Sequence, residues 1–370
     1  MYLSDFVATG LRNLSDTKLV LSSKLNIVEG VNAAGKSSLL EGIGLLVSGR
    51  SFRTSKNNQL ISHNHKDISL FGCFDDTTKI GVSFGHSKSS RKIRLNGNNI
   101  DALSKIAAIF PVQILSPESY HLIDSGPAQR RKHLDWLLFH VEHSYKSDWQ
   151  SFNKILKHRN SFLRALNGKM STIDHFQLEV WNTKLVEFAN IVDDRRNQLS
   201  KKLSIELCTV LNSMQLDFKN DITVNYHTGN GAFGLLDKLK DSIHLDVSRG
   251  STSFGSHKAD LKIKVGGRDV KDVLSRGQKK MLINALYLSQ TSLLKRLTDK
   301  DSLFIIDDFS SELDSVNQLQ LVLALREQKN VQVLISCLDS LVLKPLIKEY
   351  NSVKMFHVKH GVISEVPLPT

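Results

Sequence analysis

The first hundred residues alternate apolar and polar positions with the two-residue period of β-strands. This pattern predicts strands over residues 6–8, 18–21, 25–28, 68–74, 79–84 and 91–97. From about residue 125 to 215 the apolar positions recur every three or four residues, which predicts long antiparallel helices. Gly168 and the Ser171-Thr172 pair predict a turn between two of them. Residues 110–118, with two prolines, predict a break before the helices.

Strand patterns return in the last third of the chain. Short strands are expected over residues 216–218, 222–226 and 261–265, and a helix over 281–295. The continuous apolar run 303–306 is typical of a parallel strand that is buried on both faces, and residues 331–336 predict another buried strand. Mixed strands and helices of this kind predict an α/β protein.

The segment Gly30–Ser37 reads G-x-x-x-x-G-K-S, the phosphate-binding P-loop, between a predicted strand and a predicted helix. Glycines let the backbone turn its N–H groups toward phosphate oxygens, and the helix N-terminus adds a positive dipole end. Lys36 is expected to reach the β- and γ-phosphates, and the Ser37 hydroxyl to bind Mg²⁺. The nucleotide-binding candidates here are Gly30, Val31, Asn32, Ala33, Ala34, Gly35, Lys36, Ser37 and Ser38.

Two later motifs complete the pattern of an ABC-type ATPase. Leu274–Gln278 has the form L-S-x-G-Q of the signature loop, which in that class caps the nucleotide of a second subunit; its candidates are Ser275, Arg276, Gly277 and Gln278. The apolar run 303–306 ends in Asp307, a predicted Mg²⁺ ligand together with Ser37, and in Asp308, a candidate general base. Asp307, Asp308 and Lys36 are the catalytic candidates. Residues 311–314 resemble the D-loop and add Asp314 to the nucleotide site.

Charge and composition narrow the class of partner. The chain has 370 residues, enough for about two domains, and a net charge of +12, which favours a polyanion. Basic positions of the helical region are either a DNA-facing surface or ordinary solvated faces: Lys154, Lys157, Arg159, Arg164, Arg195, Arg196, Lys201 and Lys202. Arg50 and Arg53 lie just after the P-loop helix, as phosphate contacts or as part of a solvated loop. The three cysteines are scattered, which predicts a protein without disulfides. The sequence shows no signal peptide and no run of about 18 apolar residues, so a cytoplasmic protein is expected.

Three further stretches resemble the RecF family of DNA replication and repair proteins, among the ABC and SMC-type ATPase heads. They are Pro117-Glu118 with the run from Gly126 to Asp135 (G-P-x-x-R-R-x-H-L-D), residues 255–261 (G-S-H-K-A-D-L), and Ser51-Phe52-Arg53-Thr54. His133 stands where the family has an aromatic residue, Ser256 replaces a proline and Lys258 an arginine. Lys258 keeps the charge but loses the planar fork of arginine. The sequence also departs from the wider ABC class: Asp308 replaces a glutamate, and no histidine comes directly after the strand that ends at Ser336.

The resemblance implies a P-loop ABC/SMC-like ATPase head with a helical second lobe inserted. The expected parts are an ATPase lobe over residues 1–120, a helical lobe over 121–220, and a C-terminal part over 221–370 that carries the signature loop. It also implies ATP and Mg²⁺ as cofactors and an ATP-dependent homodimer on single- and double-stranded DNA, including gap junctions. The implied role is recombinational repair and replication-gap processing after DNA damage, with RecR and RecO, to help RecA load.

Two departures from the ABC pattern predict slow ATP hydrolysis that works as a switch. Asp308 is a shorter base than glutamate, and the switch histidine is absent. The alternative function is the ATP-binding subunit of a membrane transporter. That class is expected to have a glutamate at position 308 and a histidine after Ser336, and it need not be basic.

Overall fold

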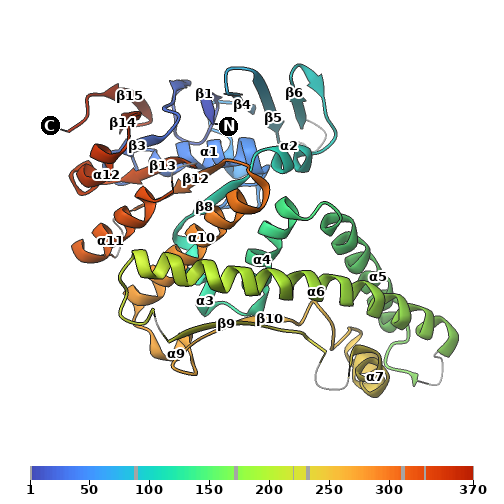
Figure 1. The fold of residues 1–370 in the computed structure, drawn as a ribbon. Helices are drawn as coiled ribbons and strands as arrows, with labels where there is room; N and C mark the ends of the chain where they lie inside the picture. Colours follow the sequence, from blue (N-terminus) through green and yellow to red (C-terminus); the bar gives the residue numbers. More distant parts are fainter. Residues whose placement is uncertain are drawn as a thin grey trace. The chain divides into compact units, whose positions relative to one another are not determined.

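The protein is described here by a computed structural model covering residues 2–86, 91–170, 174–219, 221–230, 234–309, 313–328 and 331–369. Contacts divide the chain into two compact units, and Figure 1 shows their elements in sequence colours. The first consists of Met1–His121, Thr209–Leu216 and Leu274–Thr370, and the second of Leu122–Cys208 and Asp217–Val273. The second unit thus includes residues 217–273, whereas the sequence predicted that the helical lobe ends at 220.

The first unit contains two sheets. An antiparallel sheet has the order β2-β1-β4-β5-β6-β7. A second sheet has the order β15-β14-β3-β13-β12-β8, in which all strands but the edge strand β15 run parallel. The strands of the first sheet are β1 Leu3–Thr9, β2 Thr17–Val20, β4 Asp67–Phe74, β5 Thr78–Gly85, β6 Lys92–Leu95 and β7 Asn98–Asn99. Those of the second are β3 Leu25–Glu29, β8 Val112–Leu115, β12 Ser302–Ile306, β13 Val331–Cys337, β14 Val353–Lys359 and β15 Val362–Val366.

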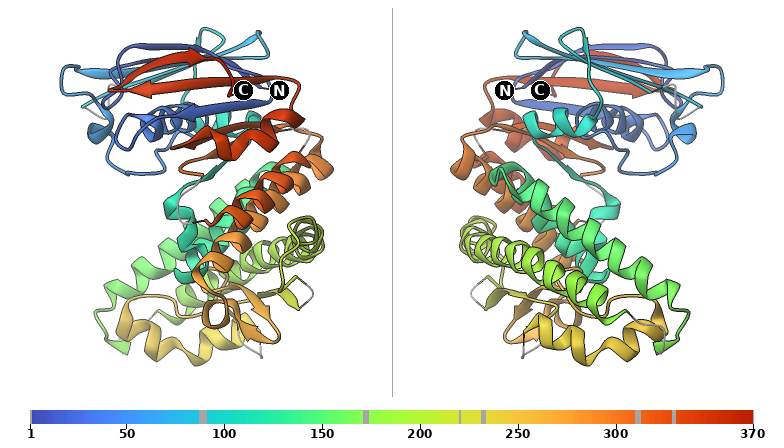
Figure 2. Two further views of the ribbon diagram at one scale, coloured as in Figure 1. Left: turned by 90° about the vertical axis from the view of Figure 1, so that its left-hand side faces the viewer. Right: turned by 90° about the vertical axis from the view of Figure 1, so that its right-hand side faces the viewer.

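Helix α1 (Lys36–Ser48) contacts strands of both sheets (Figures 1 and 2). Its apolar side chains, among them Leu39, Ile43 and Leu46, are buried in one core with Ile68 of β4 and Ile305 of β12. Every residue from Ser38 to Val47 is buried, and burial between two sheets provides the cover that such a helix needs. The other helices of this unit are α2 Leu103–Ile109, α10 Arg276–Thr298, α11 Ser315–Arg326 and α12 Lys344–Glu349, with 3-10 turns η1 Asn57–Leu60, η3 Pro117–Tyr120 and η5 Ser340–Leu343.

The second unit is built from long helices and a small antiparallel sheet, β11-β10-β9. The predicted long helices are present as α5 and α6, and Gly168 has a positive φ of 76° in the turn that follows α5. Ser171 and Thr172 of that predicted turn lie outside the described residues. The elements are α3 His121–Asp124, α4 Pro127–Val141, α5 Tyr145–Ala165, α6 His175–Ser213, β9 Ile222–His227, α7 Leu235–Asp241, α8 Ile243–Arg249, β10 Asp260–Val265, β11 Arg268–Asp269 and α9 Val270–Val273. Helices α3 and α6 cross the boundary between the units.

Two arginines that the sequence placed either on a DNA-facing surface or on a solvated helix face are instead buried. Arg159 donates to Asp246, Thr252 and Asn182 at 2.7–2.8 Å. Arg196 forms a two-bond pair with Asp135 at 2.8 Å and donates to the Ser256 carbonyl. Burying a guanidinium is costly unless it is paired in this way. Both the DNA-facing and the solvated-face interpretation are therefore wrong for Arg159 and Arg196.

Two of the family-like stretches, residues 126–135 and 255–261, meet inside the second unit. Arg130 donates from Nε and Nη2 to the two carboxylate oxygens of Asp260, at 2.8 and 3.1 Å, which joins α4 to β10. It also donates to the Ile123 and Ser125 carbonyls, and Arg131 donates to the Ala259 carbonyl. Both arginines thus have structural partners inside this unit.

Three predicted elements differ from the structure. Residues 110–118, predicted as a break, contain β8, whose short run Val112–Leu115 lies between the two prolines. Residues 216–218 form no strand; they lie in the turn that follows α6. The helix predicted over 281–295 begins earlier, at Arg276, because Ser275 caps it.

Two further features of the described chain are the apolarity of its helices and the burial of its three cysteines. None of the described helices is both long and apolar enough to cross a bilayer. Cys73 and Cys337 are buried thiols, whereas Cys208 is half-buried. Burial raises the pKa of the Cys337 thiol to about 12, so it is uncharged at neutral pH.

Candidate nucleotide-binding site

A cleft of about 970 Å³ lies over the P-loop in the first unit. Six of the nine predicted P-loop residues line it, namely Asn32, Ala33, Gly35, Lys36, Ser37 and Ser38. Asp307, Asp308 and Ser336 line it from the ends of β12 and β13. The carboxyl ends of parallel strands meet at one sheet edge, which is why these distant residues converge.

The P-loop backbone turns through conformations that require small or special residues. Ala33 and Gly35 have positive φ values of 63° and 121°. A Cβ on Gly35 would lie 2.7 Å from Leu14, and one on Gly30 would lie 2.5 Å from the Val358 carbonyl oxygen. Gly30 is therefore required by space, because its neighbour is a backbone atom, whereas Gly35 is required by its φ.

Lys36 is placed at the centre of this loop. Its Nζ donates to the carbonyl oxygens of Gly30 and Val31, at 2.7 and 3.0 Å, and the residue is only 7% exposed. These two carbonyls hold the ammonium within the loop that precedes α1. A buried cation so held is well placed to exchange carbonyl oxygens for phosphate oxygens.

Ser37 and Asp307 lie as a cation site requires. Ser37 Oγ donates to Asp307 Oδ1 at 2.9 Å, and Ser336 Oγ donates to the same oxygen at 2.8 Å. Burial raises the pKa of Asp307, and the hydrogen bonds from Ser336 and Ser37 oppose that rise. A buried carboxylate beside a hydroxyl is the oxygen donor set that Mg²⁺ prefers.

Asp308 has an unusual backbone that is held in place from β13. Its φ is 63°, its N–H donates to Ser336 Oγ at 2.8 Å, and the following Phe309 N–H donates to the Ser336 carbonyl. A non-glycine residue in this left-handed backbone conformation is under strain, and such strain is common at functional sites. The turn directs the chain so that Asp308 lines the cleft beside Asp307.

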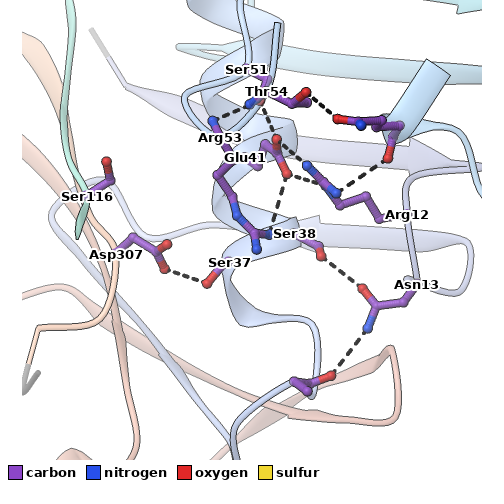
Figure 3. A network of polar contacts seen from close by, with 12 residues as sticks. Arg12, Asn13, Ser37, Ser38, Glu41, Ser51, Arg53, Thr54, Ser116 and Asp307 are labelled. Carbon is purple, nitrogen blue, oxygen red and sulfur yellow. Dashed lines mark hydrogen bonds and ion pairs between the residues drawn. The ribbon is translucent and has the colours of Figure 1, made fainter. Parts of the chain in front are cut away.

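A second polar network lines the opposite side of the P-loop (Figure 3). Ser38 Oγ donates to Asn13 Oδ1 at 2.8 Å, and Asn13 Nδ2 donates to the Ala33 carbonyl at 3.4 Å. Glu41, which is fully buried, accepts hydrogen bonds from Arg12 and Ser51.

Arg53 is part of the same network. Its Nη1 lies 3.8 Å from Glu41 Oε2, and the residue lines the cleft. Arg53 therefore belongs to the site and not to a plain solvated loop. Arg50, in contrast, is exposed and is not among the described residues that line the cleft.

The signature loop is at the surface. Ser275 caps α10: its hydroxyl accepts from the Gln278 N–H at 3.3 Å, while its own N–H donates to Gln278 Oε1 at 2.9 Å. Ser275 and Arg276 are exposed, and Gly277 and Gln278 are half-buried. In the described part of the chain, the lining of the cleft includes none of these four residues.

Asp314 begins a second helix next to the signature loop. It caps α11 by accepting from the Asn317 N–H at 2.8 Å, and it is exposed. A Cβ on Gly277 would lie 4.0 Å from Asn317 Nδ2, so the two helix N-termini are neighbours. Ser311 and Glu312 of the predicted D-loop lie outside the described residues.

Comparison with known proteins decides the family. The model of the RecF/RecN/SMC N-terminal domain matches residues 2–364. The DNA replication and repair protein RecF of Hahella chejuensis is 36% identical over 99% of this chain and 100% of its own length. That of Stutzerimonas stutzeri is also 36% identical, over 100% of this chain and 99% of its own length. The chain belongs to the RecF family of DNA replication and repair proteins.

Solved structures agree with this membership. The recombination mediator protein RecF with ATP, from the RecFOR pathway, aligns with a TM-score of 0.84 and 28% identity over 99% of this chain and 98% of that one. An Smc head bound to a domain of ScpA aligns with a TM-score of 0.57 and 14% identity, which shows the shared fold alone. The predicted ABC/SMC-like head fold is confirmed, and the transporter-subunit alternative is not favoured.

Several residues of the site are absent from the sequence-based prediction. Arg12 and Asn13 follow the first strand in a loop, and nothing local distinguishes them from a solvated turn. Glu41 lies within the P-loop helix, where a buried acid is uncommon unless paired. Ser336 is a polar residue at the end of a buried apolar run, and that position was the only available signal.

Proposed function

We propose that this RecF-family protein is an ATP-driven molecular clamp on DNA in recombinational repair. ATP binding would join two copies, with each P-loop nucleotide capped by the partner copy's Ser275. The closed dimer would hold DNA at a gap, and slow hydrolysis would release it. RecR and RecO are proposed partners, by analogy with the relatives' RecFOR pathway.

The residues of the cleft fit ATP and Mg²⁺. Lys36 would hold the β- and γ-phosphates, and Ser37 with Asp307 would hold Mg²⁺, which supplies charge neutralisation at the phosphates. Asp308 would accept a proton from the attacking water. Its side chain is one methylene shorter than a glutamate, which supports a slow rate.

One observation carries the dimer. The signature residues are exposed on the N-terminus of α10 and do not line the cleft of their own chain, as far as the described residues extend. A helix N-terminus with a capping serine is suited to bind a phosphate. The Ser275 hydroxyl accepts one hydrogen bond and can still donate its proton. A second copy can bring this group to the nucleotide.

The test is sedimentation of the purified protein with and without ATP·Mg²⁺ and DNA. We expect dimers only with ATP, and DNA affinity that falls steeply with salt because bound counterions are released. The Lys36→Ala variant should remain monomeric. A wild-type protein that stays monomeric with ATP·Mg²⁺ and DNA would contradict the proposal.

A further inference from the structure

The outer face of the antiparallel sheet in the first unit carries an exposed aromatic ring and several exposed cations. In each strand, one set of alternate residues is buried in the core around α1. The other set, apart from the buried Cys73, is partly or fully exposed. The strand registers place the exposed set in straight rows across the sheet. We call these rows the outer face of the sheet.

The central row combines an aromatic ring with cations at its ends. The pairing is Lys18 with Val7, Val7 with Phe71, Phe71 with Gly81, and Gly81 with Arg94. Phe71 is 38% exposed, and a Cβ added to Gly81 would meet only the Arg94 Cβ, at 3.9 Å. The position beside the Phe71 ring is therefore unfilled by any side chain of its neighbour.

A row of hydroxyls runs parallel to the aromatic row. Thr9 pairs with Ser69, Ser69 with Ser83, and Ser83 with Lys92. Hydroxyls and lysines are common contacts to phosphate and sugar oxygens. On the other side of the aromatic row, Val20 pairs with Asp5 on the neighbouring strand.

The charge of these rows is positive. Lys18, Lys79, Lys92 and Arg94 are exposed cations of the outer face. In the described part of these three rows, Asp5 is the one carboxylate, and it accepts a hydrogen bond from Ser4. Asp67 belongs to the next row, where it pairs with Gly85.

We propose that the outer face binds a single-stranded segment of DNA, with a base stacked on Phe71 and phosphates on Lys92 and Arg94. This assignment rests on the proposed DNA-binding function and names the surface and the form of DNA. An aromatic ring on a sheet surface binds bases that are splayed out of a duplex, and every base has a face that can stack. A paired duplex offers no such base to Phe71.

The test measures binding of a labelled thymidine oligonucleotide by fluorescence anisotropy. Phe71→Ala should weaken binding between about 5-fold and 150-fold, the range for loss of one stacked base. Phe176→Ala is the matched control, because Phe176 is an aromatic residue of α6 that is 78% exposed; it should change binding less than 2-fold. An oligonucleotide with abasic sites should remove the effect of Phe71→Ala.

A charge-reversal pair tests the role of the two cations at the phosphates. Lys92→Glu with Arg94→Glu should weaken binding more than 10-fold and lower the salt slope by about 0.7 for each phosphate that the variant no longer neutralises. Lys240→Glu with Lys348→Glu makes the same change in net charge on exposed residues of α7 and α12. This control pair should bind nearly as the wild type does.

The outcomes separate this inference from the proposed function. If the wild type binds DNA and dimerises with ATP, but the outer-face variants match their controls, the surface assignment is wrong and the proposed function stands. The same holds if the variants lose only a protein partner and keep the oligonucleotide. If the wild type binds no DNA in any nucleotide state, the proposed function itself fails.

Discussion

Replacing His133 with phenylalanine should make the protein less sensitive to acid. His133 lies on α4 and is 7% exposed, and burial lowers its pKa from 6.5 to about 3. The imidazole is therefore neutral in the folded protein over a pH range where the unfolded chain binds a proton. Stability that depends on the neutral form is fully present above pH 6.5 and is lost as the pH falls from 6.5 toward 3.

The size of the effect follows from the two pKa values. Protonation of this one group in the unfolded chain lowers the free energy of unfolding by about 2 kcal/mol at pH 5. Below pH 3 the reduction is about 5 kcal/mol. Phenylalanine cannot bind a proton, so this loss should vanish in the variant. Burial also lowers the pKa of His257, to about 4, so this group destabilises the fold at low pH in the same way. Because His257 is present in both proteins, its contribution cancels in the comparison.

The assay is urea unfolding of wild type and His133→Phe at pH 7 and pH 5. The quantity to compare is each protein's loss of unfolding free energy between the two pH values, because any packing cost of the larger ring is independent of pH. The variant should lose about 2 kcal/mol less than the wild type. His227→Phe, at an exposed histidine of β9, is the control and should behave as the wild type. Equal losses in wild type and His133→Phe would refute the reasoning.

Three further predictions concern the nucleotide site and the buried ion pair. Lys36→Ala should abolish ATP binding, measured by calorimetry, with an unchanged circular dichroism spectrum; residual affinity near that of the wild type would oppose the P-loop assignment. Asp307→Ala should keep ATP binding but lower Mg²⁺-dependent hydrolysis by on the order of 100-fold in a phosphate-release assay. Hydrolysis at the wild-type rate would show that Asp307 is not a cation ligand. Arg196→Met should destabilise by about 3–5 kcal/mol because Asp135 is left as a buried charge, whereas Arg195→Met, on the half-exposed neighbour, should cost less than about 1 kcal/mol in denaturant unfolding.

The P-loop could be predicted because its chemistry is local. Gly30, Gly35, Lys36 and Ser37 are fixed by the needs of one turn and one helix start, and the structure brings Asp307 to Ser37 across 270 residues. The link between them needed only the rule that parallel strands end at a common edge. The order of the three motifs along the chain supplied the rest.

The buried arginines could not be predicted from their own surroundings. Helical spacing shows which residues share a face, but not which face meets a carboxylate. Arg159 finds Asp246, 87 residues away, and Arg196 finds Asp135, 61 residues away. The partner decides whether a basic residue faces solvent or core, and no local pattern contains the partner.

Strand β8 was missed for a related reason. Its four residues lie between two prolines, and Gln113 interrupts the apolar run. In the structure the Gln113 amide donates to the Gln290 side chain of α10 at 2.7 Å, so the polar group is satisfied in the core. Backbone pairing with β12 makes a strand where the local pattern predicts a break.

Mixing two inactive variants tests the cross-subunit site most directly. Lys36→Ala removes the P-loop cation but keeps the signature loop. Ser275→Asp keeps a good helix cap, because aspartate caps as well as serine, but places a negative charge against the nucleotide's phosphates. Each variant alone should remain monomeric with ATP·Mg²⁺ in analytical ultracentrifugation.

A mixture of the two variants should form ATP-dependent dimers. The Ser275→Asp copy supplies an intact P-loop and the Lys36→Ala copy an intact signature loop, so each mixed dimer has one complete site. A mixture that stays monomeric, or a Ser275→Asp protein that dimerises by itself, would contradict the claim that Ser275 acts on the partner's nucleotide.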